Sequence, residues 1–422
     1  MRILYVTQQF APEMGAPSVR VLQLARNWVK RGHDVTVLTA FPNHPAGRVF
    51  PGYRRRYWRL VSTERMDGVR VTRAWHVPRS NSGTFNRLIS FSSFAASAAV
   101  TATLMRPFDV AIGTSPQILA PLAAWWRTRL PRRACVVEVR DLWPESIVAT
   151  GQGGEESASV RLLGRVARFI YGAADHIVTV TPSMRDRIMA GYGVLPERVD
   201  VVPAGVDTAM FRPEAPSDRL REGLGLTGCF VVAYVGTLGS AHGLDLVFRA
   251  AQLLQQQAPD VVFLLVGEGS ERARLEAMAG SGLSAKVRLV QAQPLQAIPG
   301  VLAASDVCLA LLKADPLFRT VVPTKMLEYM AAARPVVCNV AGEAASLLER
   351  AGGGIAVPPG NAEALASAVL KLRADPALRA RLGASGRRYV EQNADWESRS
   401  AAYEDILSRV VARRTRGSRG QI

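Results

Sequence analysis

Several common chemical signatures are missing from this sequence of 422 residues, and each absence excludes a class of protein. No two cysteines are spaced as CxxC, which argues against a disulfide framework and a zinc site; the four present are Cys135, Cys229, Cys308 and Cys338. No Asp-x-Asp triplet occurs, so the sequence predicts no aspartate-rich metal site. Residues 1–7 indicate a short strand rather than a signal peptide. We therefore expect a cytoplasmic protein with buried free thiols, no metal and no cofactor.

Charged residues make up only 21% of the chain and apolar residues 48%, which is a globular rather than a disordered or polytopic membrane composition. The net charge is +17, and residues 1–133 carry 20 Lys and Arg against 5 Asp and Glu. This excess favours an anionic membrane surface or a phosphorylated lipid as partner. Nucleic acid is the other anionic partner, but no RNA-binding, zinc-finger or helix-turn-helix pattern supports it. Only five of the 52 basic residues are lysine, so an arginine-rich proteome also explains the charge.

Long runs without charge are limited to one segment, Leu88–Met105. It is close to the lower limit for a membrane span, and it contains four serines and two threonines. Arg87 and Arg106 flank it, and the basic run 54–56 precedes it. Three interpretations stay open: a buried helix of a domain, a helix on the membrane surface, and a true span.

Short apolar runs alternate with helical patterns through the whole chain, which predicts βαβ units and parallel sheets. After the first strand, for example, Val21, Leu24, Ala25 and Trp28 recur at helical spacing. The strands expected in the first half are Ile3–Thr7, Val35–Thr39, Val69–Arg73, Val110–Gly113, Cys135–Val139, His176–Val180 and Val199–Val202. Those of the second half are Phe230–Val235, Val261–Val266, Val287–Val290, Val307–Leu311, Val336–Cys338 and Ile355–Val357.

Pro, Asp, Glu and Gly cluster around residues 211–225, which indicates a linker between two domains. The prediction is an α/β protein with two Rossmann-like domains that face each other across a cleft at the carboxyl edges of their sheets. The predicted domains are 1–210 and 211–394. We expect a last helix, about 395–411, to pack back on the first domain, and a basic tail, 412–422, to be disordered.

Three motifs that follow predicted strands point to phosphate chemistry. The first, Gly15-Ala16-Pro17, opens a helix after the first strand. Small residues there let backbone amides approach a diphosphate at a helix N-terminus, although an ordinary strand-to-helix turn has the same pattern. The spacing is not the GxGxxG fingerprint of dinucleotide binding.

The second motif is the turn 234–239, with the sequence YVGTLG, after the first strand of the second half. Gly236 and Gly239 permit the close approach of an anion, and His242 follows within reach. A further glycine turn, 267–269, closes the next strand. Either turn alone is ordinary turn chemistry, but two at equivalent places favour a binding site at the edge of the sheet.

The third motif begins at Pro323 and contains Thr324, Lys325 and Glu328. Thr324 suits an N-cap or first-turn position, and both Lys325 and the helix N-terminus attract phosphate. Glu328 lies one helical turn further on, roughly on the same face. A carboxylate that accepts two hydroxyl protons binds ribose well, although a surface Lys and Glu beside a helix start would look the same.

In this order the segments resemble the retaining glycosyltransferases of family 4, which have the GT-B fold. The resemblance is strongest to the WbuB-like subgroup, which is associated with bacterial surface-polysaccharide assembly. The segments that carry it are MRILYVTQQFAPEMGAPSVR, GHDVTVLTAFPNHPAGRV, VRDLWPES, YVGTLG and VPTKMLEYMAAARPVV. The resemblance spans nearly the whole chain, and the combination is specific although each segment alone is not.

The resemblance implies a role for residues in both domains. Gly15 and Ala16 would border the sugar diphosphate, while Arg140, Asp141 and Glu145 would hold the transferred sugar. Glu328 would bind the ribose as the second glutamate of the family's E-x7-E motif. Gln291 and Pro294 would frame the nucleobase through backbone groups. The remaining donor contacts would come from Gly236, Thr237, Leu238, Gly239, His242, Thr324 and Lys325.

Four positions depart from the family pattern. Thr320 stands where the first glutamate of E-x7-E is expected. Thr237 and His242 replace the usual basic pair, so Lys325, backbone amides and either Arg319 or Arg272 would have to neutralise the diphosphate. Arg140 replaces the histidine of a frequent His-Asp pair, which leaves the catalytic arrangement open.

The expected activity is metal-independent, retaining transfer of a hexose from a nucleotide sugar, a UDP-sugar rather than a GDP-sugar. The expected acceptor is a polyprenyl-diphosphate-linked sugar or another saccharide. We expect the protein to lie on the inner face of the cell membrane without binding nucleic acid. A nucleotide-sugar epimerase of the same fold is one alternative. A non-catalytic protein that binds membrane or nucleic acid is the other.

Overall fold

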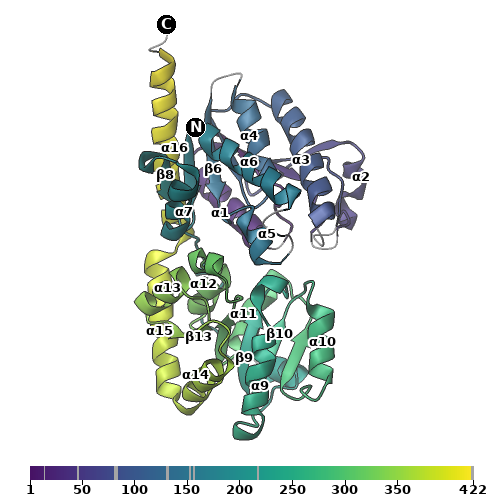
Figure 1. Ribbon diagram of the computed structural model, residues 1–422, viewed down its shortest axis with the longest axis vertical. Helices are drawn as coiled ribbons and strands as arrows, with labels where there is room; N and C mark the ends of the chain where they lie inside the picture. The colour runs from purple at the N-terminus through teal and green to yellow at the C-terminus, as the bar shows by residue number, and fades with distance from the viewer. Residues whose placement is uncertain are drawn as a thin grey trace. The chain divides into compact units, whose positions relative to one another are not determined.

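The chain folds into two compact units, which are described separately here (Figure 1). The structure is a computed structural model and describes residues 1–13, 15–44, 47–79, 84–129, 133–151, 154, 157–215 and 218–419. The first unit is Met1–Ala204 with Trp396–Ile422, and the second is Gly205–Asp395. The second unit begins before the predicted residue 211, because the amide of Val206 donates to the carbonyl of Ala394 and Phe211 is buried.

The first unit contains an eight-stranded sheet in the order β3-β4-β2-β1-β5-β6-β7-β8. The strands are β1 Arg2–Val6, β2 Asp34–Ala40, β3 Val61–Met66, β4 Val69–Ala74, β5 Val110–Thr114, β6 Ala134–Val139, β7 His176–Thr179 and β8 Val199–Val201. Only β3 is antiparallel to its neighbour; the other pairings are parallel. All seven strands predicted in the first half are present. The sequence prediction missed β3, since this edge strand alternates between exposed and half-buried residues and has no apolar run.

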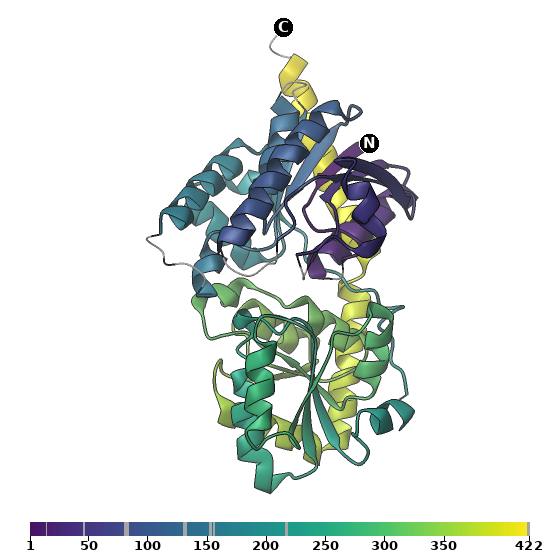
Figure 2. The same cartoon turned by 90° about the vertical axis from the view of Figure 1, so that its right-hand side faces the viewer.

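Helices cover both faces of this sheet (Figure 2). They are α1 Ala16–Lys30, α2 Arg54–Tyr57, α3 Thr84–Leu104, α4 Leu119–Arg129, α5 Glu145–Ala149, α6 Ala158–Ala173, α7 Pro182–Tyr192 and α16 Trp396–Arg419. The predicted apolar face of α1 is buried, and α16 packs against it. The indole N–H of Trp28 donates to the carbonyl of Ser400 at 3.0 Å, and its ring lies 5.4 Å from that of Tyr403. The end of the chain thus completes the core of the first unit.

The last helix is longer than predicted, because α16 continues to Arg419 where a disordered tail was expected. Its arginines are paired with residues of the same unit: Arg409 lies 2.8 Å from Asp200 and Arg414 lies 3.2 Å from Asp175. Arginine also has a high helix propensity, so a basic segment with acidic partners prolongs the helix. Residues 420–422 of the predicted tail lie outside the described residues.

Helix α3 contains the long segment without charge, and it lies on the first sheet with one face exposed. Phe94, Ala98 and Ala102 are buried in a core with strands β1, β2, β4 and β5 and helix α4. Val100 and Leu104 are exposed. Asn86–Leu104 has the length and composition of a membrane span, and 28% of it is buried in the protein. A span would have to remove the buried face from this core, so the structure favours a domain helix with an apolar outer face.

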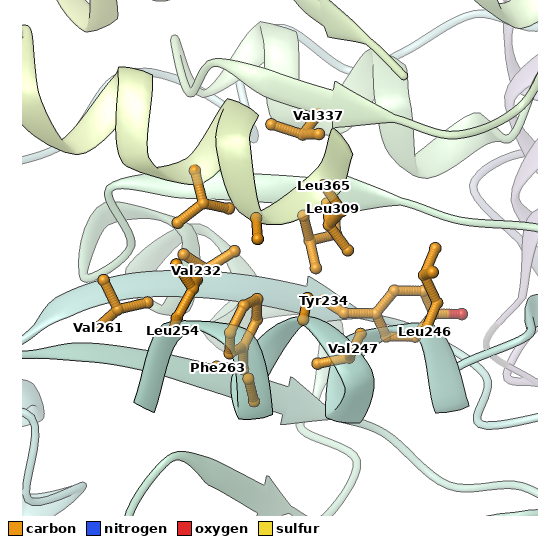
Figure 3. Close-up of a cluster of buried hydrophobic side chains, with 14 of the residues drawn as sticks. Val232, Tyr234, Leu246, Val247, Leu254, Val261, Phe263, Leu309, Val337 and Leu365 are labelled. Atoms are coloured by element: carbon orange, nitrogen blue, oxygen red, sulfur yellow. The ribbon is translucent and has the colours of Figure 1, made fainter. Parts of the chain in front are cut away.

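The second unit contains a six-stranded sheet in the order β11-β10-β9-β12-β13-β14, and all its pairings are parallel. All six predicted strands are present, as β9 Phe230–Val235, β10 Val261–Val266, β11 Val287–Val290, β12 Val307–Ala310, β13 Val336–Cys338 and β14 Gly354–Ala356. The helices are α8 Asp218–Gly223, α9 Asp245–Gln257, α10 Arg272–Gly280, α11 Ile298–Ala303, α12 Thr324–Ala331, α13 Glu343–Ala351, α14 Ala362–Ala374 and α15 Pro376–Asn393. Figure 3 shows the core, in which Leu246 and Leu254 of α9 and Leu365 of α14 pack on strand residues such as Val232 and Phe263.

Candidate functional site

The carboxyl edge of the second sheet brings the predicted donor-binding turns together. Val235, Val266 and Val290 are the last residues of β9, β10 and β11, and they lie in register. Hydrogen bonds continue one residue further, from the amide of Gly236 to the carbonyl of Val266 and from the amide of Gly267 to that of Val290. Turns that are distant in the sequence therefore begin side by side at this edge, as in other open α/β sheets.

Glycine is required in these turns because their backbones touch. A Cβ atom on Gly267 would lie 1.8 Å from the carbonyl oxygen of Gly236, and one on Gly269 would lie 2.2 Å from that of Leu238. Gly236 and Gly267 also have positive φ angles of 142° and 157°. Gly239 differs, because a Cβ there would make only ordinary contacts. Packing thus explains two glycines of the 267–269 turn that the sequence suggested for anion binding.

Lys325 points its amine at the glycine turn. Its Nζ atom lies 3.7 Å from the ring centroid of Tyr234, and a Cβ on Gly236 would lie 2.7 Å from Nζ. This Nζ is buried and has no hydrogen-bond partner among the described residues. Burial lowers the pKa of Lys325 to about 7, and the nearby Glu328 carboxylate opposes that shift. An unpaired amine in such a place is poised to receive an anion.

Tyr329 fixes α12 to the end of β9. Its hydroxyl accepts from the amide of Val235 at 2.9 Å and donates to the carbonyl of the same residue at 3.0 Å. Thr324 is the first residue of α12, and Pro323 at the N-cap provides no side-chain cap. The amide of Met326 donates to the carbonyl of Pro323 at 3.0 Å, which leaves those of Thr324 and Lys325 as the amides that α12 can offer to a ligand near the turn that contains Gly236.

Glu328 lies one helical turn after Lys325 in α12, on the same side of the helix. Burial raises the pKa of Glu328 to about 7, and the Lys325 charge opposes that shift. Its carboxylate makes no hydrogen bond or ion pair with the described residues, and burial and the Lys325 charge alone shift its pKa. The site therefore holds two unpaired groups of opposite charge, one at the glycine turn and one a helical turn away.

His242 follows the glycine turn but adds no positive charge. Its ring packs edge-on against Tyr234 at 5.8 Å, and its Nδ1 lies 3.4 Å from the carbonyl of Leu311. Burial, and then the charge of Lys325, lower the pKa of His242 to about 3. The imidazole is neutral at physiological pH, so it could offer an anion a hydrogen bond but no charge.

Other predicted donor residues occupy different environments. Leu238 is fully buried, and both its backbone amide and its carbonyl are bonded within the turns, so it supports the site rather than contacting a ligand. Thr237 is exposed, as are Gln291 and Pro294 in the loop after β11. The carbonyl of Gln291 accepts a 3.1 Å hydrogen bond from the side chain of Gln293, which fixes part of that loop.

The two candidate arginines differ in availability. Arg272 donates to the carbonyl of Gly267 at 2.8 Å and forms ion pairs with Glu268 and Glu276. Its guanidinium therefore stabilises the glycine turn. Arg319 is exposed and has no such partner among the described residues, so it remains available for a diphosphate.

In the first unit, Gly15 and Ala16 lie exposed at the start of α1. Gly15 has an extended backbone with φ at 172°, and a Cβ there would lie 3.7 Å from the nearest atom, in Pro17. Neither conformation nor packing requires glycine at this position. The approach of a ligand to this helix N-terminus stays a prediction from the sequence.

Arg140 is held inside the first unit. Its side chain is 8% exposed and donates two hydrogen bonds, of 2.9 and 2.7 Å, to the carbonyl of Ser115. Its Nε lies 3.7 Å from the carboxylate of Glu138, which is completely buried on β6. Glu138 also accepts from Tyr5 at 2.5 Å and from Arg20 at 2.9 Å. The sequence prediction missed Glu138, although an isolated glutamate within the apolar run ACVVEV was a visible signal.

Asp141 and Glu145 follow the carboxyl end of β6. Burial raises the pKa of Asp141 to about 6, with hydrogen-bond donors at Ser146 and Leu142 opposing the shift. Glu145 is the first residue of α5, and one of its oxygens accepts from the hydroxyl of Tyr192 at 2.9 Å. Its other oxygen is buried without a partner among the described residues. Throughout the residues that the structure describes, no group of three or more His, Cys, Asp or Glu side chains forms a metal-binding arrangement.

Comparisons with known proteins identify the family. Residues 15–205 match the model of the glycosyl transferase 4-like domain, and residues 229–375 match that of the glycosyl transferases group 1. A GDP-mannose-dependent alpha-(1-6)-phosphatidylinositol monomannoside mannosyltransferase of Mycolicibacterium smegmatis is 30% identical over 62% of this chain and 70% of its own. The chain belongs to the group 1 glycosyltransferases.

Two further comparisons cover almost the whole glycosyltransferase. The colanic acid biosynthesis glycosyl transferase WcaI of Escherichia coli (strain K12) is 26% identical over 94% of this chain and 97% of its own. The crystal structure of Anabaena HepE in complex with UDP-glucose has a TM-score of 0.71 and 21% identity, covering 97% of this chain and 99% of that one. The predicted fold class, GT-B, is confirmed, as is membership of family 4, whose enzymes retain the anomeric configuration. The protein is therefore a nucleotide-sugar glycosyltransferase.

Thr320, which stands where the resemblance implies a glutamate, has a local structural role in this glycosyltransferase. Thr320 is buried and its hydroxyl donates to the carbonyl of Leu317 at 2.8 Å, so it takes part in the local turn. Lys325 is placed by Tyr234 and by the Gly236 turn. The sequence analysis assigned no role to Tyr234 or Tyr329, and the placement of Lys325 depends on the packing of α12 against β9, where Tyr329 bonds to Val235.

Proposed function

We propose that this glycosyltransferase moves a hexose, with retention, from a UDP-sugar to a lipid-linked sugar in the synthesis of a bacterial surface polysaccharide. The observation that carries the donor half of this proposal is the unpaired Lys325 amine between the Gly236 turn and the Tyr234 ring. Glu328 one turn away supplies a second unpaired group of opposite charge. This spacing suits a nucleoside diphosphate, with phosphate at the amine and ribose hydroxyls at the carboxylate.

Donor binding would favour the charged form of both Lys325 and Glu328. A bound diphosphate stabilises the ammonium form of Lys325 and returns its pKa toward the ordinary value. Two ribose hydroxyls that donate to Glu328 stabilise its ionised form in the same way. The helix N-terminus of α12 adds its amides, and Arg319 is the additional cation that remains available.

The leaving diphosphate is the group that needs stabilisation in the reaction. The bond between the anomeric carbon and the β-phosphate oxygen breaks, and the acceptor oxygen forms a bond to that carbon on the same face. The acceptor proton passes to the departing phosphate, so no protein nucleophile is required. Lys325, backbone amides and Arg319 would carry the developing negative charge without a metal ion.

The first unit would position the sugar and the acceptor. Asp141 is the candidate that could contact the transferred sugar, since its carboxylate is free of ion pairs in the structure described. Arg140 and Glu145 are bonded to Ser115 and Tyr192, so we assign them to positioning the β6 edge. Gly15 and Ala16 would let the α1 amides approach the donor diphosphate.

The acceptor and the location are inferred from relatives and from surface chemistry. One relative is named for colanic acid biosynthesis and another acts on a phosphatidylinositol mannoside, so a surface-polysaccharide or lipid-linked acceptor fits this chain. In the first unit, Trp58 is 80% exposed beside the basic run 54–56, and Leu88, Val100 and Leu104 are exposed on α3. Aromatic and basic residues together favour an anionic membrane surface, and we propose peripheral attachment to its cytoplasmic face.

A donor panel tests this function. The purified protein is incubated with UDP- and GDP-sugars, with and without a polyprenyl-diphosphate sugar, and the products are separated. Transfer that depends on the acceptor supports the proposal. Epimerised or hydrolysed donor without acceptor would instead identify the epimerase alternative. Failure to bind any nucleotide sugar would instead favour the non-catalytic alternative, a protein that binds membrane or nucleic acid.

A further inference from the structure

Glu138 on β6 is a buried carboxylate to which the proposed reaction gives no role. Its side chain is completely buried, and one of its oxygens accepts from the hydroxyls of Tyr5 at 2.5 Å and Thr114 at 2.9 Å. The other oxygen accepts from Nε of Arg20 at 2.9 Å. Nε of Arg140 lies 3.7 Å from the first oxygen. Four partners, from β1, β5, α1 and the residue that follows β6, thus converge on one carboxylate.

The carboxylate stays ionised in this position. Burial raises the pKa of Glu138, but the charges of Arg20 and Arg140 outweigh burial and lower the pKa below its ordinary value. Replacing buried ion pairs by apolar residues of similar volume often leaves a fold as stable as before, or makes it more stable. Stability alone therefore does not account for a charged group at this point of the sheet.

Arg20 is a fixed counter-ion of Glu138. Its Nη1 and Nη2 atoms donate to the carbonyls of Pro203 at 3.0 Å and Val202 at 2.9 Å. All three of its nitrogens are therefore bonded, and its side chain is almost completely buried. Glu138 is thus held from one side, and its other ionic contact is to Arg140.

Arg140 connects Glu138 to the end of β5 and to Asp141. Its guanidinium donates to the carbonyl of Ser115 at 2.9 and 2.7 Å. The hydroxyl of Ser115 in turn accepts from the amide of Arg140 at 2.9 Å and donates to the carbonyl of Asp141 at 3.1 Å. The backbone of residues 140–141 is therefore fixed to Ser115, and this set of contacts begins at Glu138.

The same contacts determine the charge beside Asp141. One carboxylate between two guanidinium groups leaves a single positive charge in the cluster. The groups that act on Asp141 through charge or hydrogen bonding are Arg140, Leu142, Glu145, Ser146 and Tyr171. Arg140 is the cation among them, so Glu138 opposes the positive charge that Asp141 experiences.

We propose that Glu138 is a positioning residue for glycosyl transfer, which holds Arg140 against Ser115 and thereby fixes the place and the charge environment of Asp141. Glu138 itself does not touch the substrate. This inference rests on the proposed function, in which Asp141 contacts the transferred sugar. It adds a buried residue outside the predicted site, and its loss should affect the chemical step rather than the binding of the nucleotide.

Glu138→Gln in the full chain tests this role with little change of shape. Glutamine keeps an oxygen that can accept from Arg20 but removes the negative charge. We expect kcat for transfer to fall about ten-fold or more, because a small displacement of a group that contacts the substrate is costly. The Kd for UDP should stay unchanged, since Lys325 and Glu328 lie in the second unit.

Glu64→Gln is the matched control. Glu64 also pairs with two arginines of the first unit, Arg56 at 2.8 Å and the buried Arg73 at 2.6 Å. This variant should leave kcat unchanged. If Glu138→Gln does not fold, Tyr5→Phe replaces it, because it removes one hydrogen bond to Glu138 and keeps every charge. Its kcat should fall roughly two- to ten-fold with unchanged UDP affinity, and a wild-type kcat would overturn the inference.

The titration of Asp141 is a readout that a loss of stability would not move. NMR of the aspartate carboxyl carbons, assigned with Asp141→Asn, should show this group titrating near pH 6 in wild type, because burial raises its pKa to about 6. In Glu138→Gln the Arg140 charge is no longer opposed, so it favours the carboxylate and moves the titration to lower pH. Glu64→Gln should not move it. An unmoved titration in folded Glu138→Gln, or a lower Tm with wild-type kcat, would overturn the positioning role.

Failure of this inference differs from failure of the proposed function. If wild type transfers sugar and Glu138→Gln and Glu64→Gln have equal kcat, the positioning role is refuted and the proposed function stands. If no transfer occurs but Glu138→Gln alone moves the Asp141 titration, the proposed function is refuted. In that outcome the control of Asp141 by Glu138 is still established.

Discussion

Replacing Glu328 by glutamine tests the donor site with a small change of shape. The substitution removes the negative charge but keeps the length of the side chain and one carbonyl oxygen. If the carboxylate accepts both ribose hydroxyls, the variant loses one charge-assisted bond and weakens the other. Such bonds contribute about 1.5–3 kcal/mol. The Kd for UDP should therefore rise roughly 10- to 150-fold.

The assay is a titration of wild type and variant with UDP and with 2′,3′-dideoxy-UDP. Wild type should lose affinity when the hydroxyls are removed, whereas Glu328→Gln should lose little more. The two changes are then coupled, as in a double-mutant cycle. If the donor proves to be a GDP-sugar, GDP and 2′,3′-dideoxy-GDP replace these two probes.

The unliganded variant should also be more stable at alkaline pH. Burial raises the pKa of Glu328 from 4.5 to about 7, so the folded state binds this proton more tightly than the unfolded chain does. The stabilising contribution is full below about pH 4.5 and is lost as the pH rises through 7. At pH 8 the ionised carboxylate therefore destabilises the fold, and glutamine does not.

The size of this effect is bounded by the pKa shift. A shift from 4.5 to about 7 corresponds to a ceiling of about 3 kcal/mol, which partial exposure and the neighbouring Lys325 reduce. We expect a gain of about 1 kcal/mol at pH 8, or a Tm higher by about 2–4 °C, and no gain at pH 4.5. Calorimetry at both pH values measures it.

Glu349→Gln is the matched control, because Glu349 is an exposed glutamate on α13 of the same unit. It should change neither UDP affinity nor the pH dependence of Tm. The ribose assignment would be refuted if folded Glu328→Gln bound UDP as wild type does. It would also be refuted if removal of the two ribose hydroxyls weakened binding as much in the variant as in wild type.

Four other measurements follow from the structure. UDP affinity should peak near pH 7, because the Lys325 ammonium and the Glu328 carboxylate, both with a pKa of about 7, must both be charged to bind phosphate and ribose; Lys325→Met should remove the fall above pH 7, and a fall that survives refutes the assignment. Activity should survive a strong chelator, and loss that magnesium or manganese restores would show a metal-dependent mechanism. Gly267→Ala should destabilise the second unit by ~3 kcal/mol, since its Cβ would meet the Gly236 carbonyl, and an unchanged Tm would contradict that packing. The protein should co-sediment with anionic vesicles at low salt and be released by high salt. It should bind more weakly when Arg54, Arg55, Arg56 and Arg59 become Gln. No binding at low salt would exclude peripheral attachment, and resistance to both salt and alkali would indicate a membrane span.

The sheet strands could be predicted because parallel strands with both faces covered have continuous apolar runs. Each run such as Phe230–Val235 is buried on both faces, so its identity does not depend on its partners. The edge strand β3 has no such run and was missed, since only pairing with β4 makes it a strand. The helix α16 continues beyond residue 411 for a related reason: Arg414 lies beside Asp175, which only the fold brings to it.

The sequence by itself also determined the residues that could contact a nucleotide sugar, through their order after strands and their likeness to a known family. Tertiary structure decided which of them are available. Arg140 and Arg272 are cations in the sequence, but hydrogen bonds to Ser115 and Gly267 occupy them in the fold. Lys325 remains unpaired, because Tyr234 presents a ring to it where a carboxylate would have neutralised it. Charge and spacing are properties of the chain, whereas desolvation and pairing arise only when distant segments pack together.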